Sequence, residues 1–385
     1  MAVRPCIVIP GIQGSALENL YTISPTTTWS TLAVAETHLV APDFKSLALD
    51  DGGQSDADEE VVSRPSQLLA IAYAPLVNGL RGRQNVPAYL FPYDWRTSIV
   101  QSAETLVSYV KRLMRKTMPT ITHWDQTFDF ACHSMGGLVL RAFLDAWRKS
   151  NQNPPPVGQV VFIATPHQGS LEAAQSLISG ESPLFGGRKE LRKLARTFPA
   201  VYELMPRFPN AVIQSGRTLD IFDEHNWQTN TTSQDPDPNG FDVRQRHLTA
   251  AKLVLDNLPR PTDRIPAGDL LVVYGAKANS TLRAVEVGPD PDKWYDFDHG
   301  RRDIGDDVVP VESALLAGVA SVELRPEDIS YIAHPIERTY TASDMHAFLP
   351  ALDEVATIVS RFFDGRRSPG DLLPRGIPAA RLHPA

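Results

Sequence analysis

Short apolar runs alternate with longer amphipathic stretches along most of the chain. The first run, Cys6 to Ile9, lies between two prolines and is typical of a buried parallel strand. Similar runs occupy residues 88–91, 128–133, 160–164 and 269–275. Between them, apolar residues recur every three or four positions, as in residues 99–114, which indicates a crossover helix. This order predicts a mostly parallel sheet flanked by helices, with right-handed crossovers.

The alternation stops between residues 171 and 265. Helical pieces at 189–204 and 246–258 flank a polar, proline-rich centre, and an insertion this long is usually functional. After it we expect an added strand, a last strand and a terminal helix, at residues 282–287, 336–341 and 346–363. The predicted organisation is therefore an α/β core, a helical and irregular cap, and a flexible proline-rich tail, formed by residues 1–170 with 266–365, 171–265 and 366–385.

The composition limits which classes of protein fit. The chain has 385 residues, 42% of them hydrophobic, which is enough for a large core. The net charge is −8 and no basic block occurs, so we expect no nucleic-acid partner. Cys6 and Cys132 both fall in predicted buried strands, which excludes a disulfide framework and fits a reducing compartment. We see neither a secretory signal nor a membrane-spanning run, so we expect a cytoplasmic location.

One loop superficially resembles a metal site. Asp235 to Gly240 matches the start of a calcium-binding EF-hand loop, but Arg246 stands where the bidentate glutamate is required. We therefore predict a loop there, and expect the chain to use no metal and no cofactor.

Ser134 lies where an apolar run ends and a helical pattern begins. Residues 128–137 indicate a strand, a tight turn and a helix, with the serine at the tip of the turn. A nucleophile elbow of this kind needs small residues two positions before and two after the serine, and these are Cys132 and Gly136. A serine that merely caps the helix fits the same pattern. His133, beside the serine, is expected to pack within the turn.

An acid and a histidine follow the serine at separate points of the chain. The order nucleophile, acid, histidine is that of the α/β-hydrolases. A serine hydroxyl needs an imidazole to accept its proton, and the imidazole needs a carboxylate that holds it in one tautomer. We expect the catalytic set to be Ser134, Asp306 and His346, with Asp307 as the alternative acid and His334 as the alternative histidine.

A glycine-punctuated loop, residues 10–15, follows the first predicted strand. It contains neither a dinucleotide-binding glycine motif nor a Walker lysine, so it is a weak candidate for phosphate binding. In α/β-hydrolases the loop after an early strand supplies one N–H to the oxyanion hole. By position we expect the backbone N–H groups of Gln13 and Met135 to form that hole. Residues 20–85, which follow, are predicted to be irregular.

A cluster of polar and aromatic residues, Pro92 to Arg96, closes the second predicted strand. These side chains could line a site. The favoured alternative is structural: an Asp–Arg pair and an aromatic residue that fix the corner between a strand and a helix.

Five segments of the chain resemble signature segments of the lecithin:cholesterol acyltransferase (LCAT)-like family: residues 10–18, 92–96, 133–136, 164–170 and 305–309. They stand in the family's order, and residues 165–170 are also similar to bacterial triacylglycerol lipases. The resemblance implies an α/β-hydrolase fold and serine acyl-ester chemistry on lipids. It also implies an acyl-enzyme on Ser134, a triad completed by Asp306 and His346, and oxyanion donors at Gln13 and Met135. Cys132 replaces the family's elbow glycine, and the disulfides of the secreted relatives have no counterpart.

The leading functional hypothesis is a serine carboxyl-ester hydrolase of the lipase or phospholipase A type. Its expected partner is a lipid or another acyl-ester substrate, with transient contact to a membrane surface as a further expectation. The alternatives are a lipid acyltransferase, a lipase-type effector module of a larger regulated protein, which the proline-rich tail suggests, and a non-catalytic scaffold. The serine, acid and histidine together count against the last of these.

Overall fold

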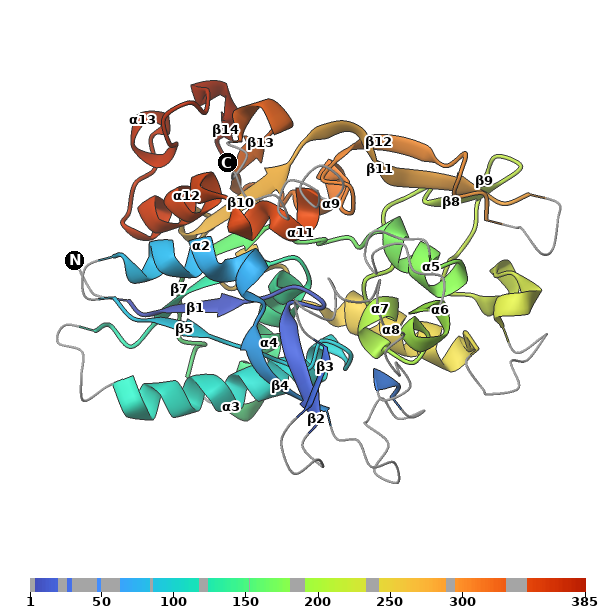
Figure 1. Ribbon diagram of the computed structural model, residues 1–385, viewed down its shortest axis with the longest axis horizontal. Helices are drawn as coiled ribbons and strands as arrows, with labels where there is room; N and C mark the ends of the chain where they lie inside the picture. Colours follow the sequence, from blue (N-terminus) through green and yellow to red (C-terminus); the bar gives the residue numbers. More distant parts are fainter. Residues whose placement is uncertain are drawn as a thin grey trace.

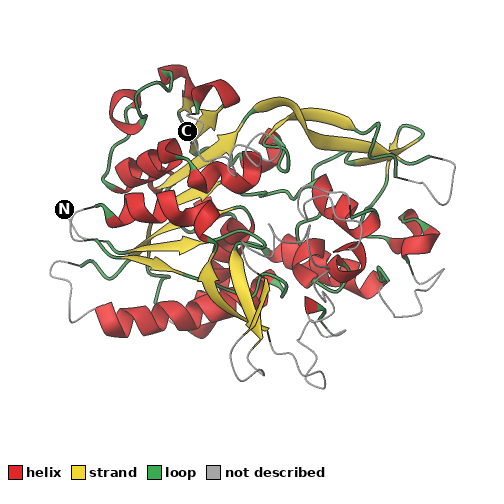
Figure 2. Ribbon diagram, viewed as in Figure 1, coloured by secondary structure: helices red, strands yellow, loops and turns green. Residues whose placement is uncertain are grey.

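The computed structural model describes residues 4–19, 26–29, 47–49, 63–83, 86–117, 124–151, 153–180, 191–232, 242–288, 295–329 and 345–385. Within them, the central element is a seven-stranded sheet (Figure 2). Its strands, in spatial order, are β14 (Leu382–His383), β13 (Ala320–Leu324), β10 (Leu270–Gly275), β7 (Val157–Ile163), β6 (Phe128–His133), β1 (Cys6–Ile9) and β5 (Ala88–Leu90). Neighbouring strands run parallel, except that β14 is antiparallel to β13. The predicted mostly parallel sheet is confirmed.

Helices cover both faces of this sheet. Ile7 and Ile9 of β1 belong to one hydrophobic cluster, which includes helices α3 (Ile99–Thr117) and α4 (Met135–Ser150). Cys6 and Val8 belong to a second cluster on the opposite face, which includes α2 (Ala70–Arg81) and α12 (Asp353–Phe363). Figure 1 shows α2 and α12 on one side of the strands and α3 on the other. Because both faces are buried, strands such as β1 and β10 are continuous apolar runs rather than alternating ones.

Among the described residues, two smaller sheets accompany the central one. The first contains β3 (Thr26–Trp29), β2 (Ser15–Asn19) and β4 (Ser63–Leu68), and the second contains β12 (Arg301–Gly305), β11 (Lys277–Glu286), β8 (Val212–Gln214) and β9 (Arg217–Thr218). The added strand predicted at residues 282–287 corresponds to the second half of the longer strand β11.

The other α-helices of the described residues are short, apart from α8. They are α5 (Leu171–Ile178), α6 (Leu191–Ala195), α7 (Pro199–Tyr202), α8 (Gln245–Asn257), α9 (Val311–Ala314), α11 (Met345–Phe348) and α13 (Pro369–Leu372). Figure 1 shows α5, α6, α7 and α8 gathered on the side toward which β1 points. These four helices lie in the segment expected to form a cap, and its action as a lid stays a prediction.

The carboxyl-terminal segment differs from its predicted flexible form. Residues 369–372 form α13, and residues 382–383 form β14 at the edge of the central sheet. Leu372 and Leu373 are buried in the cluster that contains Phe362. Arg381 pairs with Asp328 at 2.5 Å. A few apolar anchors thus order a segment whose proline and glycine content indicated a linker, and the effector-module alternative stays a prediction.

The segment before β5 also differs from its predicted irregular form. It contains the twelve-residue helix α2, whose buried positions Tyr73, Leu76, Val77 and Leu80 have helical spacing. Pro75 lies inside this helix and obscures the pattern, because proline normally interrupts a helix interior.

Several expectations fall outside the described residues. They are the loop 235–240, the strand 336–341 and the alternative histidine His334. Among the described helices, none combines the length and the apolar character needed to cross a bilayer.

Candidate active site

Ser134 occupies a strained turn between β6 and α4. Its φ is 51° and its ψ is −126°, a conformation that side-chain-bearing residues rarely adopt. Its backbone N–H donates to the Ile163 carbonyl of the neighbouring strand, at 2.8 Å. The backbone of β1 packs so closely that a Cβ at Gly136 would lie 2.5 Å from the Ile9 carbonyl oxygen. The elbow therefore has the predicted strand, turn and helix, and its second small residue is required by packing.

The structure brings His346 and Asp306 to this serine. His346 Nε2 lies 2.8 Å from Ser134 Oγ, and His346 Nδ1 lies 2.8 Å from Asp306 Oδ2. Because a carboxylate can only accept, Nδ1 carries the hydrogen and Nε2 is free to accept from the serine hydroxyl. Asp306 Oδ1 accepts from the N–H groups of Val308 and Val309, at 3.2 and 2.7 Å. The carboxylate is thus held on both oxygens, and all three side chains are buried.

Asp306 follows β12 in sequence but lies beside β10 in space. A Cβ placed on Gly275, the last residue of β10, would lie 2.7 Å from the Cβ of Asp306. Ser134 follows β6, which is in the same sheet. Serine and acid therefore meet at the carboxyl edge of the central sheet, where open parallel sheets form their sites.

Asp307, the alternative acid, faces a different partner. Its Oδ2 accepts from the backbone N–H of Met345 at 2.9 Å, and its Oδ1 lies 2.8 Å from Lys277 Nζ. Its own N–H donates to Thr281 Oγ1 at 3.0 Å. Asp306, not Asp307, contacts the imidazole, and Asp307 holds the backbone one residue before His346.

The loop after β1 is held from several sides. Tyr93 Oη donates to the Pro10 carbonyl at 2.9 Å, and Trp95 Nε1 donates to the Ser15 carbonyl at 3.0 Å. Arg96 pairs with Asp94 at 2.7 Å. This confirms the structural interpretation of residues 92–96: they fix a corner, and that corner supports the loop.

The two expected oxyanion donors lie in different elements beside Ser134. Met135 directly follows Ser134 as the first residue of α4 and is fully buried. Gln13 lies in the loop after β1 with φ of 62°, a left-handed conformation that only a few non-glycine residues adopt. That loop touches the elbow, since a Cβ at Gly11 would lie 2.8 Å from the Cβ of Ser134. The roles of Gln13 and Met135 as oxyanion donors stay a prediction.

His133 and Tyr73 also belong to the site, and the sequence did not single them out for it. His133 was expected only to pack, but both of its ring nitrogens make hydrogen bonds. Tyr73 lies on α2, in a segment for which no element was predicted. The helical spacing of Tyr73, Leu76, Val77 and Leu80 is the signal that would have revealed it.

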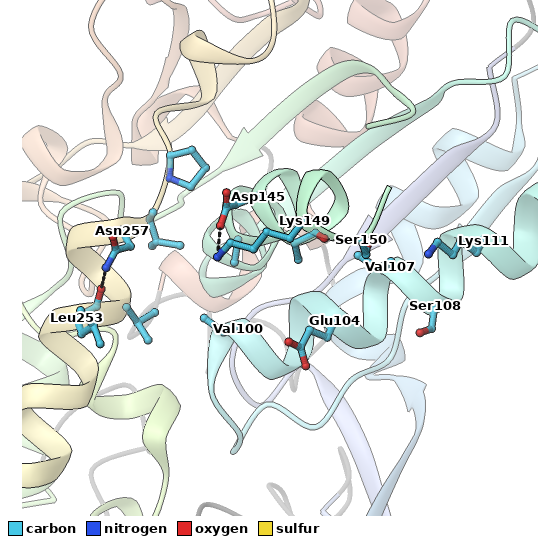
Figure 3. Close-up of a pocket in the computed structure, with 15 residues that line it drawn as sticks. Val100, Glu104, Val107, Ser108, Lys111, Asp145, Lys149, Ser150, Leu253 and Asn257 are labelled. Atoms are coloured by element: carbon cyan, nitrogen blue, oxygen red, sulfur yellow. Dashed lines mark hydrogen bonds and ion pairs between the residues drawn. The ribbon is translucent and has the colours of Figure 1, made fainter. Parts of the chain in front are cut away.

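A separate groove of about 600 Å³ lies between α3, α4 and the end of α8 (Figure 3). Its lining mixes apolar side chains such as Val107 and Leu253 with charged ones such as Glu104 and Lys149. None of the predicted site residues lines it. In the part of the chain that the structure describes, no group of three His, Cys, Asp or Glu side chains is arranged to hold a metal ion.

The fold and the position of Ser134 define the class of the protein. A parallel sheet covered by helices, with a serine on a strained turn after a central strand, is the α/β-hydrolase architecture. The family model described as lecithin:cholesterol acyltransferase matches residues 67–252 of this chain. That match includes Ser134 and ends before Asp306 and His346. Comparison with curated proteins at the sequence level gave no match.

Several solved structures match this chain at low sequence identity. The Tle4–Tli4 complex matches with a TM-score of 0.58 and 17% identity, covering 93% of this chain and 99% of that chain. The lipase BlEst2 of Bacillus licheniformis, in mature form, matches with a TM-score of 0.36 and 12% identity, covering 84% of both chains. Lipase 1 of Pelosinus fermentans matches with a TM-score of 0.34 and 12% identity, covering 95% of this chain and 97% of that chain.

Proposed function

We propose that the protein is a serine carboxyl-ester hydrolase that acts on lipid esters through an acyl-enzyme on Ser134. The observation that carries the proposal is the 2.8 Å contact between Ser134 Oγ and His346 Nε2, together with the 2.8 Å contact between His346 Nδ1 and Asp306 Oδ2. Nucleophile and base are within hydrogen-bond reach, and the base is oriented by a third group, which is the pattern of an activated serine.

The proposed reaction uses these hydrogen bonds. His346 removes the hydroxyl proton as Ser134 Oγ attacks the ester carbonyl, and Asp306 stabilises the imidazolium that forms. The backbone N–H groups of Gln13 and Met135 donate hydrogen bonds to the oxyanion of the tetrahedral intermediate. His346 then returns the proton to the leaving alcohol, and a water molecule attacks the acyl-enzyme by the same steps. The lipid class of the substrate is supported by the family match.

The test is ester turnover by the wild type and the Ser134→Ala variant. We expect the wild type to hydrolyse p-nitrophenyl acyl esters and to react with a fluorophosphonate probe, and the variant to do neither while keeping its circular dichroism spectrum. Ser150→Ala is the matched control, because Ser150 is exposed at the other end of α4. Turnover by Ser134→Ala at the wild-type rate would contradict the proposal.

Acyl transfer to an alcohol is a second candidate, favoured by the description of the matching family model. It uses the same acyl-enzyme, which an alcohol resolves instead of water. Mass spectrometry of products from a mixed lipid extract, with and without an added lysolipid or sterol acceptor, separates the two. New acyl esters of the acceptor, absent with Ser134→Ala, would indicate a transferase, and free fatty acid alone would indicate a hydrolase.

A further inference from the structure

A chain of buried hydrogen bonds runs behind Ser134. The hydroxyl oxygen of Tyr73 lies 2.8 Å from the backbone nitrogen of Gly11 and 2.8 Å from Nδ1 of His133. On the other side of the same ring, His133 Nε2 lies 3.0 Å from the carbonyl oxygen of His346. Both Tyr73 and His133 are at most 4% exposed.

Each hydrogen in this chain has one consistent position. The His346 carbonyl can only accept, so His133 Nε2 must carry a hydrogen. Burial lowers the pKa of His133 well below its ordinary value, so the ring is neutral and Nδ1 accepts. Nδ1 therefore receives the Tyr73 hydroxyl hydrogen, whose loss is opposed because burial raises the pKa of Tyr73. The Tyr73 oxygen in turn accepts from the Gly11 N–H.

The two ends of this series of hydrogen bonds lie at the two parts of the site that must be aligned. Gly11 belongs to the loop after β1, in which Gln13 lies two residues further on. The His346 carbonyl belongs to the residue whose imidazole contacts Ser134. We propose that Tyr73 and His133 are positioning residues that hold this loop and the backbone of His346 in register on either side of Ser134. This proposal rests on the proposed function.

The same geometry keeps the second histidine out of the reaction. The rings of His133 and His346 are 5.2 Å apart between centroids, and His133 directly precedes Ser134 in the sequence. Both nitrogens of His133 are occupied by Tyr73 and by the His346 carbonyl, so this ring has no nitrogen with which to remove a proton from the serine. His346 alone has its Nε2 directed to the hydroxyl.

The kinetic test uses Tyr73→Phe, which removes one oxygen atom and leaves both Gly11 N–H and His133 Nδ1 unpaired. We expect kcat for a p-nitrophenyl ester to fall about 10- to 100-fold, because small misplacements of aligned groups cost this much. KM should change less than about 3-fold, since the loss is confined to the transition state. Tyr202→Phe is the matched control: it also removes a buried hydroxyl, which donates to the Arg196 carbonyl instead.

A pair of variants at His133 separates hydrogen bonding from packing. His133→Phe fills the space but has no polar atom, and we expect it to lose at least as much kcat as Tyr73→Phe. His133→Gln supplies one acceptor and one donor, and we expect it to recover a large part of that loss. Wild-type kcat in Tyr73→Phe, or equal losses in His133→Phe and His133→Gln, would overturn the positioning role.

A spectroscopic measurement keeps this proposal separate from the proposed function. In the wild-type protein labelled with ¹⁵N, we expect His133 to be the neutral Nε2–H tautomer, and Tyr73→Phe to accelerate hydrogen exchange at the Gly11 amide. If the wild type turns over no ester, the proposed function fails, whereas the hydrogen-bond chain is judged by these spectra. A His133 ring protonated at Nδ1, or a Gly11 amide indifferent to Tyr73→Phe, would overturn the chain itself.

Discussion

Asp307 accepts a hydrogen bond from the backbone N–H of Met345, with 2.9 Å between Oδ2 and the nitrogen. Two adjacent acids thus hold one histidine by different parts: Asp306 contacts the imidazole of His346, and Asp307 contacts the backbone that carries it. Lys277 lies 2.8 Å from the other oxygen of Asp307 and balances its charge. Asp306 therefore orients the imidazole ring of His346, whereas Asp307 holds the start of helix α11, which carries this residue.

Substitutions at the two acids should have effects of different size. Asp306→Asn should lower kcat by roughly 10³- to 10⁴-fold, because an amide can favour the wrong tautomer of the histidine. Asp307→Asn should cost much less, since the amide oxygen can still accept from Met345 and asparagine tolerates the φ of 80° at this position. Steady-state kinetics on ester substrates measures both. Asp303→Asn, at an exposed acid three residues upstream, is the control, and equal losses at 306 and 307 would contradict the assignment.

Gly136→Ala should damage both stability and turnover. The new Cβ would lie 2.5 and 2.6 Å from the carbonyl oxygens of Ile9 and Pro10, which are backbone atoms at the start of the loop beside Ser134. We expect a loss of about 1–3 kcal/mol in the free energy of unfolding, measured by urea denaturation, together with loss of ester turnover. Gly268→Ala is the control, because a Cβ there would meet no atom within 4 Å. Wild-type behaviour of Gly136→Ala would show that the elbow and the loop pack less closely than described.

Glu203 should make stability depend on pH. It is buried and accepts from Ser98 Oγ and from the N–H of Ile99, at 2.7 and 2.6 Å, and burial raises its pKa from 4.5 to about 7. The carboxyl group of Glu203 therefore binds its proton more tightly in the folded state than in the unfolded state. The carboxyl group makes stability fall as pH rises from about 4.5 to about 7, by roughly 3 kcal/mol in total.

Urea denaturation at pH 5 and pH 8 measures this dependence. Burial also raises the pKa of Asp129 to about 7, so both carboxyl groups contribute to the pH dependence of wild-type stability. The difference in this dependence between wild type and Glu203→Gln isolates the contribution of Glu203. We expect the glutamine variant to lose less stability between the two pH values. Glu104→Gln, at an exposed position of α3, should follow the wild type. A parallel loss in Glu203→Gln and wild type would refute the assignment.

The packing of the carboxyl-terminal segment can be tested at Leu372, which is 1% exposed. Leu372→Ala should lower the free energy of unfolding by about 2–5 kcal/mol, as buried leucine truncations do. Leu253→Ala is the control at a side chain that is 64% exposed, where we expect a change within about 0.5 kcal/mol. The same small change at Leu372 would restore the interpretation of this segment as a flexible tail.

The elements that the sequence predicted well are those in which one local pattern had one physical cause. The strands ending at Ile9 and Gly275 are buried on both faces, so they are continuous apolar runs that stand out without any knowledge of the fold. Helix α3 has a regular apolar stripe for the same reason. Strand β13 was missed because it alternates: Val322 and Leu324 are fully buried between residues such as Glu323.

Amino-acid order alone led to the proposed serine chemistry, because a serine on a strand–turn–helix motif, followed by an acid and a histidine, has the order of the α/β-hydrolases. Which of two adjacent acids reaches the imidazole was decided only by the tertiary structure, since the turn at Asp306 and Asp307 directs the two carboxylates to different partners. The same holds for Tyr73 and His133, whose partners lie 62 and 213 residues away in the chain. The local sequence pattern indicates which residues are buried and where the chain turns. Contacts between distant segments exist only once the sheet has assembled.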